Sequence, residues 1–307
     1  MIKGIPYGVY PTMVTPYKKE NTIDYDGVLA LLDWYKRKNC DGIFAICQSS
    51  EIFFLSFEEK LELLRFIMAN KPDGITIIAS GHTEEDADLQ VEQAKAYIDT
   101  GIDAYVFISN RFAKREESDD ILLKNMLNVV ERLPEIALGI YECPYPYKRL
   151  LSPYVLCELA KTGKFCFLKD TCCDLTQIEA KLKAVEGSDF GIYNANSATL
   201  LESLKLGCRG FSGVMGNFHP EIYSYLCKNF SKEPEKAQII QEFLGFASLA
   251  ECQMYPINAK YYLSLDKVPI SYDSRARSSA EFTENRKMEI DQLYACTCFF
   301  KKQIGIV

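Results

Sequence analysis

The chain has 307 residues, 48% of them hydrophobic and 25% charged, with a formal net charge of −7 at pH 7. This composition is typical of a folded protein with a sizeable core and excludes a largely disordered chain. Because no run of Lys and Arg accompanies the negative charge, nucleic-acid binding and contact with an anionic membrane are disfavoured, and we expect a small-molecule partner.

The first segment, residues 1–17 (MIKGIPYGVYPTMVTPY), contains neither a long apolar stretch nor a small-residue cleavage site. No segment reaches the roughly 18 consecutive apolar residues that a membrane-spanning helix needs. The twelve cysteines follow neither a disulfide framework nor a zinc-binding pattern, and His82 and His219 are the only histidines. We therefore expect a cytoplasmic protein with reduced thiols that uses no metal and no organic cofactor.

Short runs rich in β-branched and aromatic residues alternate with longer amphipathic segments, which is typical of βα units around a parallel sheet. Successive runs begin 19 to 34 residues apart. A (β/α)₈ barrel has roughly 30 residues per unit. The sequence therefore predicts an α/β fold, a (β/α)₈ TIM barrel in residues 1–230. Its eight strands begin near Gly8, Asp41, Ile75, Asp103, Ile136, Phe165, Phe190 and Arg209.

Helix-start signals lie between these runs. Ser56 is followed three residues later by Glu59, which is the spacing of a capping box. Ser152 precedes Pro153, a combination that suits an N-cap and the first helical position. Residues 28–35 (VLALLDWY) show apolar side chains at helical spacing. These segments are predicted to be helices that pack one face on the barrel.

After about residue 230 the strand-like runs stop. Two helical stretches are predicted in their place, 234–255 and 283–300, with Pro256 and residues 272–279 as breaks. No low-complexity linker separates them from the barrel, so we expect residues 231–307 to form a helical extension that docks on it.

Active sites of such barrels lie at the carboxyl ends of the strands. Lys169 ends the sixth run, where an apolar setting disfavours the ammonium form and exposes a nucleophilic amine. An ion pair with the neighbouring Asp170 is the alternative. Tyr141 ends the fifth run, so we expect it beside Lys169, either as a proton shuttle or as a side chain that caps the core.

Other strand ends offer further candidates. Ser49 and Ser50 follow the second run and can bind a small carboxylate through hydroxyl and backbone N–H groups, or they simply form a turn. Cysteines at strand ends make a thiol enzyme conceivable, although no Cys/His signature accompanies them; they are Cys47, Cys143, Cys172 and Cys173. Late glycines suggest either a phosphate-binding loop or close packing; they are Gly207, Gly210, Gly213 and Gly216.

In this order the segments resemble the dihydrodipicolinate synthase and N-acetylneuraminate lyase family of class I aldolases over nearly the whole chain. The resemblance implies a barrel with a C-terminal helical extension, and an imine between the lysine of the sixth strand and pyruvate. The matching segments are TPY (15–17), CQSSE (47–51), LSFEEK (55–60), ITIIASG (75–81), YECP (141–144), FLKD (167–170) and GFSGVMGN (210–217).

The resemblance also assigns roles in imine formation. Lys169 matches the imine-forming lysine, and Tyr141 matches the tyrosine that relays protons. Gly213, in the last matching segment, is expected to contact the substrate.

The loop after the second strand is expected to hold the carboxylate of pyruvate. If Glu51 is placed on the family's loop glutamate, Gln48 and Ser49 match the two carboxylate-binding residues. A shift of one residue gives this role to Ser49 and Ser50.

The residues that differ from the family's pattern are those expected to lie near the second substrate. Arg111 and Phe112 replace a tyrosine pair, and Phe112 lacks the hydroxyl that many members lend across a dimer interface. Pro146 stands where the synthases have a carboxylate-binding arginine, so synthase activity is not expected. We expect Arg111 to bind an anionic group of the second substrate. A solvated arginine, or one paired with Glu142, is the alternative.

The sequence thus predicts a class I lyase that condenses pyruvate or another 2-oxo acid with Lys169 and makes or breaks a carbon–carbon bond. One alternative is a dehydratase of 2-oxo sugar acids that uses the same imine. Another is a catalytically silent barrel that binds a small acid. The resemblance further implies a homodimer or homotetramer.

Overall fold

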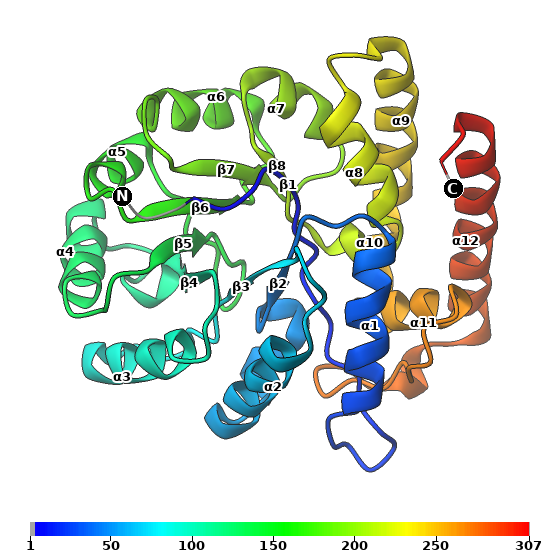
Figure 1. The fold of residues 1–307 in the computed structure, drawn as a ribbon, viewed down its shortest axis with the longest axis horizontal. Helices are drawn as coiled ribbons and strands as arrows, with labels where there is room; N and C mark the ends of the chain where they lie inside the picture. Colours follow the sequence, from blue (N-terminus) through cyan, green and yellow to red (C-terminus); the bar gives the residue numbers. More distant parts are fainter. Residues whose placement is uncertain (1–3, 307) are drawn as a thin grey trace.

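The structure, a computed structural model, describes residues 4–306. Eight parallel strands form one sheet in the order β1-β8-β7-β6-β5-β4-β3-β2, and a parallel bridge between Thr12 and Phe44 joins its two edges. The predicted (β/α)₈ barrel is confirmed (Figure 1). The strands are β1 (Gly8–Val9), β2 (Gly42–Ala45), β3 (Thr76–Ala79), β4 (Ala104–Ile108), β5 (Ala137–Tyr141), β6 (Phe165–Asp170), β7 (Gly191–Asn194) and β8 (Gly210–Phe211).

The interior of the barrel is filled by aromatic side chains. Tyr10, Phe44, Phe167 and Tyr193 form a chain of ring contacts with centroid distances of 4.7 to 5.9 Å. Strands β4, β5, β6 and β7 are buried throughout, as expected of parallel strands that are covered on both faces. The barrel is therefore a packed core, and an open site is confined to its ends.

Seven helices follow β1 to β7, and an eighth follows β8 (Figure 1). Ser56 and Glu59 form the expected capping box, and Ser152 caps the helix that begins at Pro153. Both predicted helix starts are confirmed. The helices are α1 (Tyr25–Arg37), α2 (Phe57–Asn70), α3 (Ala87–Ile98), α4 (Asp119–Val130), α5 (Pro153–Lys161), α6 (Leu175–Ala184), α7 (Leu200–Leu206) and α8 (Pro220–Asn229).

The chain continues as α9 (Pro234–Ala247), α10 (Glu251–Met254), α11 (Ile257–Leu265) and α12 (Glu284–Ile304). Helix α9 lies beside α12 on one side of the barrel (Figure 1), with Phe243 and Phe300 stacked at 4.1 Å. We did not predict α11. Most of its residues are buried, so it lacks the polar face that makes a surface helix visible in a sequence. The division of the chain at residue 230 into barrel and extension stays a prediction.

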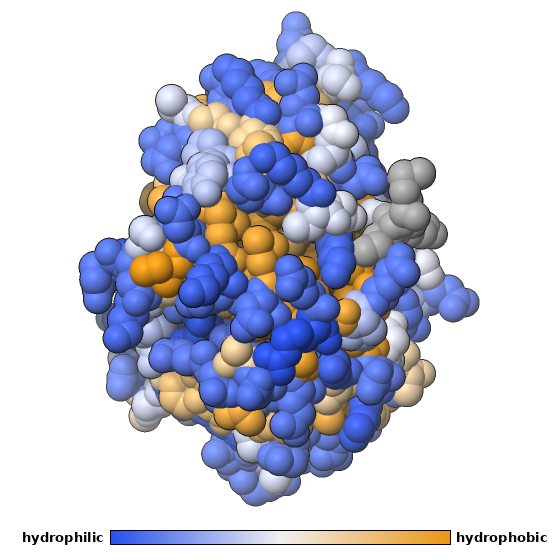
Figure 2. Space-filling model, turned by 90° about the vertical axis from the view of Figure 1, so that its left-hand side faces the viewer, coloured by the Kyte–Doolittle hydropathy of each residue, from blue (hydrophilic) through white to orange (hydrophobic). Residues whose placement is uncertain are grey.

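Among residues 4–306, no helix is both long and apolar enough to cross a membrane. Figure 2 shows the side that carries α3, α4 and α5, where apolar side chains gather near the centre and smaller apolar areas lie among polar side chains elsewhere on this face. Exposed large apolar residues on these helices include Leu89, Ile121 and Tyr154. The predicted homodimer or homotetramer stays a prediction.

Candidate active site

A pocket of about 560 Å³ opens at the carboxyl ends of the strands. Buried strand-end residues form its floor, whereas exposed residues of the βα loops and of the helical extension form its rim. The pocket brings together most of the residues singled out from the sequence, namely Lys169, Tyr141, Gln48, Ser49 and Gly213.

Lys169 lies on the floor and is only 3% exposed. Its Nζ lies 4.2 Å from the ring centroid of Tyr141 and makes no hydrogen bond or ion pair with the residues that the structure describes. Asp170 pairs with Lys181 instead, so the alternative of a Lys169–Asp170 pair is wrong. Burial lowers the pKa of Lys169, against the opposing influence of Cys47, Cys143 and Glu251. A lower pKa leaves more of the amine neutral and nucleophilic at neutral pH.

Tyr141 is the register partner of Lys169 on the adjacent strand, as expected from the spacing of the two βα units. Its hydroxyl donates to Oε1 of Gln48 at 3.0 Å, and the thiol of Cys143 donates to the same oxygen at 3.3 Å. Burial raises the pKa of Tyr141 well above its ordinary value. Tyr141 is therefore a neutral phenol beside the amine, and it holds its proton in the hydrogen bond to Gln48.

The two serines of the loop after β2 point in different directions. Ser49 lines the pocket and donates to the hydroxyl of Thr12 at 2.9 Å. Ser50 points away from the pocket, because its hydroxyl donates to the carbonyl of Met13 and accepts from the N–H of Cys47. This geometry favours Gln48 and Ser49 over Ser49 and Ser50 as the pair that faces a substrate.

Glu51 ends this loop with a φ of 63°, in the left-handed region. One carboxylate oxygen lies 2.7 Å from Nζ of Lys260 in α11, and this ion pair is buried. The other oxygen accepts from the hydroxyl of Ser274 and from the N–H groups of Arg275 and Ala276. Glu51 therefore joins the substrate loop to the helical extension.

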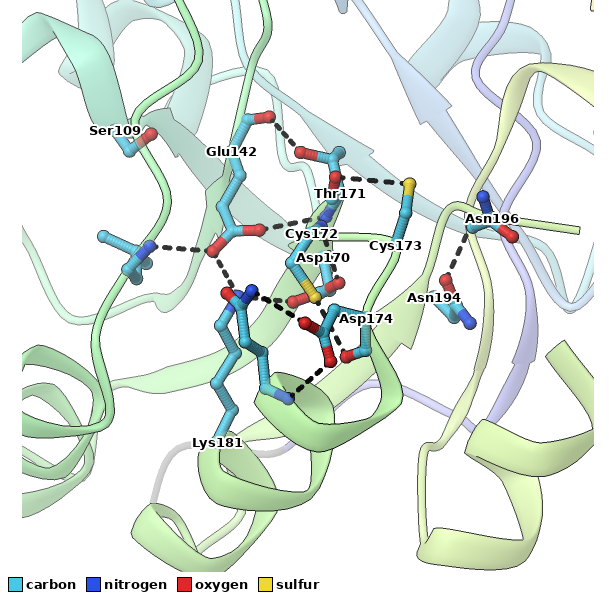
Figure 3. A network of polar contacts seen from close by, with 12 residues as sticks. Ser109, Glu142, Asp170, Thr171, Cys172, Cys173, Asp174, Lys181, Asn194 and Asn196 are labelled. Carbon is cyan, nitrogen blue, oxygen red and sulfur yellow. Dashed lines mark hydrogen bonds and ion pairs between the residues drawn. The ribbon is translucent and has the colours of Figure 1, made fainter. Parts of the chain in front are cut away.

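A buried charged network lies behind the strand ends (Figure 3). Lys181 of α6 reaches Glu142 at 2.6 Å and Asp170 at 2.5 Å. Glu142 also accepts from the N–H groups of Leu151 and Thr171. Because Glu142 follows Tyr141 and Asp170 follows Lys169, the network fixes both strand ends from the side opposite the pocket.

Gly213 lines the pocket where β8 ends. A Cβ at this position would lie 2.5 Å from the carbonyl oxygen of Ala195 and from the ring of Phe211. Close packing therefore requires glycine here, and the absence of a side chain keeps that side of the pocket open.

Arg111 and Phe112 are not among the residues that line the pocket. The guanidinium of Arg111 lies 3.1 Å from Glu85 and 5.4 Å from the ring centroid of Phe53. The suggested partner Glu142 is wrong, because Glu142 is held by Lys181. Phe112 is buried against His82 and Phe107 of its own chain. The role of Arg111 toward a second substrate stays a prediction.

Sequence reasoning missed the side of the pocket that the extension provides. Glu251, Tyr255 and Arg277 line it, together with Lys148 of the loop after β5. Their spacing along the chain does not predict that they line the pocket, because only the packing of the extension on the barrel brings them there.

The fold and the site define a class: a TIM barrel with a neighbouring tyrosine and a buried lysine at its mouth, the lysine having no ion-pair partner among residues 4–306. Residues 6–281 match the model of the dihydrodipicolinate synthetase family. The chain therefore belongs to this family, whose members are lyases.

Curated relatives include the 4-hydroxy-tetrahydrodipicolinate synthase of Clostridium perfringens, 24% identical over 255 residues, which cover 82% of this chain and 86% of the relative. The enzyme of the same name from Haloarcula marismortui is 24% identical over 275 residues, which cover 88% of this chain and 84% of the relative.

Among solved structures, the YagE prophage protein of E. coli K12, in complex with pyruvate, has a TM-score of 0.85 at 20% identity, over 98% of this chain and 99% of that one. The dihydrodipicolinate synthase of Acinetobacter baumannii, complexed with pyruvate, has a TM-score of 0.84 at 21% identity, over 99% of this chain and 100% of that one. At these identities the likeness shows the fold.

Proposed function

We propose that this protein is a class I lyase that forms a Schiff base between Lys169 and pyruvate or another 2-oxo acid, then makes or breaks a carbon–carbon bond. The observation that carries the proposal is the unpaired amine of Lys169, buried at the floor of the pocket with Tyr141 beside it. A desolvated amine is the nucleophile that imine formation needs. The pyruvate complexes of the two barrel relatives fit this substrate class.

Each residue of the floor has a part in the proposed reaction. The amine of Lys169 adds to the 2-oxo carbon. Tyr141 gives a proton to the departing hydroxyl, so that water leaves and the imine remains. Ser49 and Gln48 receive the carboxylate through hydroxyl and amide donors. The protonated imine then acts as the electron sink, without a metal or an organic cofactor.

Borohydride trapping tests the proposal. Reduction in the presence of pyruvate should convert the imine into a 1-carboxyethyl group on the peptide that contains Lys169, as read by mass spectrometry. Lys169→Ala should abolish the label, whereas Lys183→Ala, on the exposed face of α6, should keep it. Tyr141→Phe should slow labelling roughly 10²-fold or more, because a proton donor is lost. Label on another lysine, or none with any 2-oxo acid, would contradict the proposal.

A further inference from the structure

One side of the pocket is apolar and is formed by two loops. Phe53 and Phe54 come from the loop after β2, and Pro144 and Tyr145 come from the loop after β5. The rings of Phe53 and Tyr145 contact each other, with centroids 4.7 Å apart, and so join the two loops. We call these four residues the apolar wall. None of them carries a charged side chain.

Two rings of the apolar wall are exposed. Phe54 is 49% exposed and Tyr145 is 51% exposed, and both line the pocket. Large apolar side chains that gather at a cavity are typical of a ligand-binding surface, because water leaves them only when a ligand covers them. The packing of the protein itself therefore does not account for these two rings.

The backbone under both rings is held in place from behind. The buried side-chain amide of Asn110 donates to the carbonyl oxygens of Cys143 and Tyr145 at 3.1 and 3.0 Å. The guanidinium of Arg275 donates to the carbonyl oxygen of Phe54 at 3.1 Å. The apolar wall is therefore preformed, and a ligand that covers it does not have to order the loops first.

The pocket has room for more than pyruvate. Its volume of about 560 Å³ lies in the range of sites that enclose ligands much larger than a three-carbon acid. A 2-oxo acid on Lys169 occupies the floor and leaves the part toward the rim for a second substrate. Against the apolar wall, a polyhydroxylated chain would lose hydrogen bonds to water without replacement, whereas a flat aromatic ring would gain apolar contact.

We propose that the second substrate is an aldehyde with an aromatic ring, and that this ring packs against Phe54 and Tyr145. The inference rests on the proposed imine at Lys169 and names the class of molecule with which bound pyruvate reacts. It also distinguishes this pocket from one built for sugar-derived acids, in which hydrogen-bonding side chains would face the second substrate.

The proposed condensation needs no further reactant. Tyr141 has lost its proton to the departing hydroxyl, so it takes a proton from the methyl carbon, and the C–H electron pair forms the enamine double bond while the C=N π pair moves to nitrogen. The enamine carbon then bonds to the aldehyde carbon, the C=O π pair moves to oxygen, and Tyr141 returns the proton to that oxygen. Hydrolysis of the imine frees Lys169 and a 4-hydroxy-2-oxo acid that carries the ring.

Condensation of pyruvate with two aldehydes tests the inference. Benzaldehyde carries an aromatic ring, and D-glyceraldehyde carries hydroxyl groups instead. The kcat/KM of the wild-type protein should be roughly 10-fold or more higher for benzaldehyde, as measured by chromatography of the products. Phe54→Ala and Tyr145→Ala should each lower the value for benzaldehyde roughly 10-fold and change that for glyceraldehyde by less than about twofold, since only the ring contact is lost.

Two control variants accompany these substitutions. Phe54→Leu keeps an apolar side chain without a ring and should retain part of the activity with benzaldehyde. Phe246→Ala removes a ring of α9 that is 75% exposed and is not among the residues that line the pocket, so both activities should equal those of the wild type. Borohydride labelling of Lys169 with pyruvate alone should be unchanged in every variant.

The results distinguish the inference from the proposed function. A selective loss of benzaldehyde activity in Phe54→Ala and Tyr145→Ala, with normal labelling, supports the inference. Equal losses for both aldehydes, no loss, or loss of labelling in these variants overturns it. A wild-type protein that labels but prefers glyceraldehyde, or condenses neither aldehyde, also overturns it and leaves the imine at Lys169 intact. Failure of the wild-type protein to label overturns the proposed function itself.

Discussion

Two arginines compete for the anionic end of a second substrate. The comparison with the family's residues suggests Arg111 for this role, but its guanidinium forms an ion pair with Glu85 outside the pocket. Arg277 lies on the rim, where its Nε donates to the carbonyl of Tyr255 and its terminal nitrogens make no hydrogen bond with residues 4–306. A guanidinium with free terminal nitrogens can grip a carboxylate through two charge-assisted bonds.

We therefore expect Arg277→Ala to raise the KM for an anionic aldehyde roughly 10-fold or more, since a hydrogen bond to a charged group contributes about 1.5–3 kcal/mol. Condensation of pyruvate with glyoxylate, compared with neutral glycolaldehyde, measures the effect, and borohydride labelling of Lys169 should be unchanged. Arg111→Lys is the competing variant. A larger KM change in that variant than in Arg277→Ala would return the role to Arg111.

At the scale of single elements, β5 and β6 depend on the network at Lys181. Burial alone would lower the pKa of Lys181, but Glu142 and Asp170 raise it well above its ordinary value. The lysine therefore stays charged and neutralises one of the two carboxylates buried behind the strand ends. Such a network is costly to break, because the remaining charges cannot reach water.

Lys181→Met should lower the free energy of unfolding by about 3–5 kcal/mol, as expected when a buried charge loses its partner. Lys183→Met removes only an exposed ion pair with Glu179, so its effect should stay within about 0.5 kcal/mol. Urea unfolding of both variants measures the difference. Similar stabilities would mean that the network contributes little to holding the two strand ends.

The elements that the sequence predicted are those with a regular local pattern. All eight strands and the caps at Ser56 and Ser152 follow from alternation and spacing. Lys169 and Tyr141 follow from their strand-end positions. Helix α11 and the pocket residue Glu251 do not, because one is buried on most sides and the other reaches the pocket only through tertiary packing.

For the whole molecule, two buried histidines link stability to pH. Burial lowers the pKa of His82 from 6.5 to about 3 and that of His219 from 6.5 to about 4. Both ring nitrogens of His219 lack a hydrogen-bond partner within the described part of the chain. In the unfolded chain both residues take up a proton near pH 6.5, whereas the folded protein excludes it.

The contribution of the two neutral histidines to the free energy of unfolding should therefore be fully present above about pH 6.5. It should be lost as the pH decreases toward the folded pKa values. From pH 6.5 to pH 5 each histidine should cost about 2 kcal/mol, at roughly 1.4 kcal/mol per pH unit. His219→Phe keeps an aromatic ring against Tyr223 and removes the titrating group. Urea unfolding at pH 7 and pH 5 should show a pH-dependent loss smaller by about 2 kcal/mol in this variant. An equal loss in both proteins would refute the assignment to His219.

The ion pair between Glu51 and Lys260 joins the loop that faces the substrate to a helix outside the barrel. The proposed bond-forming groups thus belong to the strands, whereas much of the rim belongs to the extension. Substitutions in the extension can therefore change which molecules enter while the amine and the phenol stay in place. Because the rim and the bond-forming groups lie in different parts of the chain, related barrels can change their substrates while the reaction stays the same.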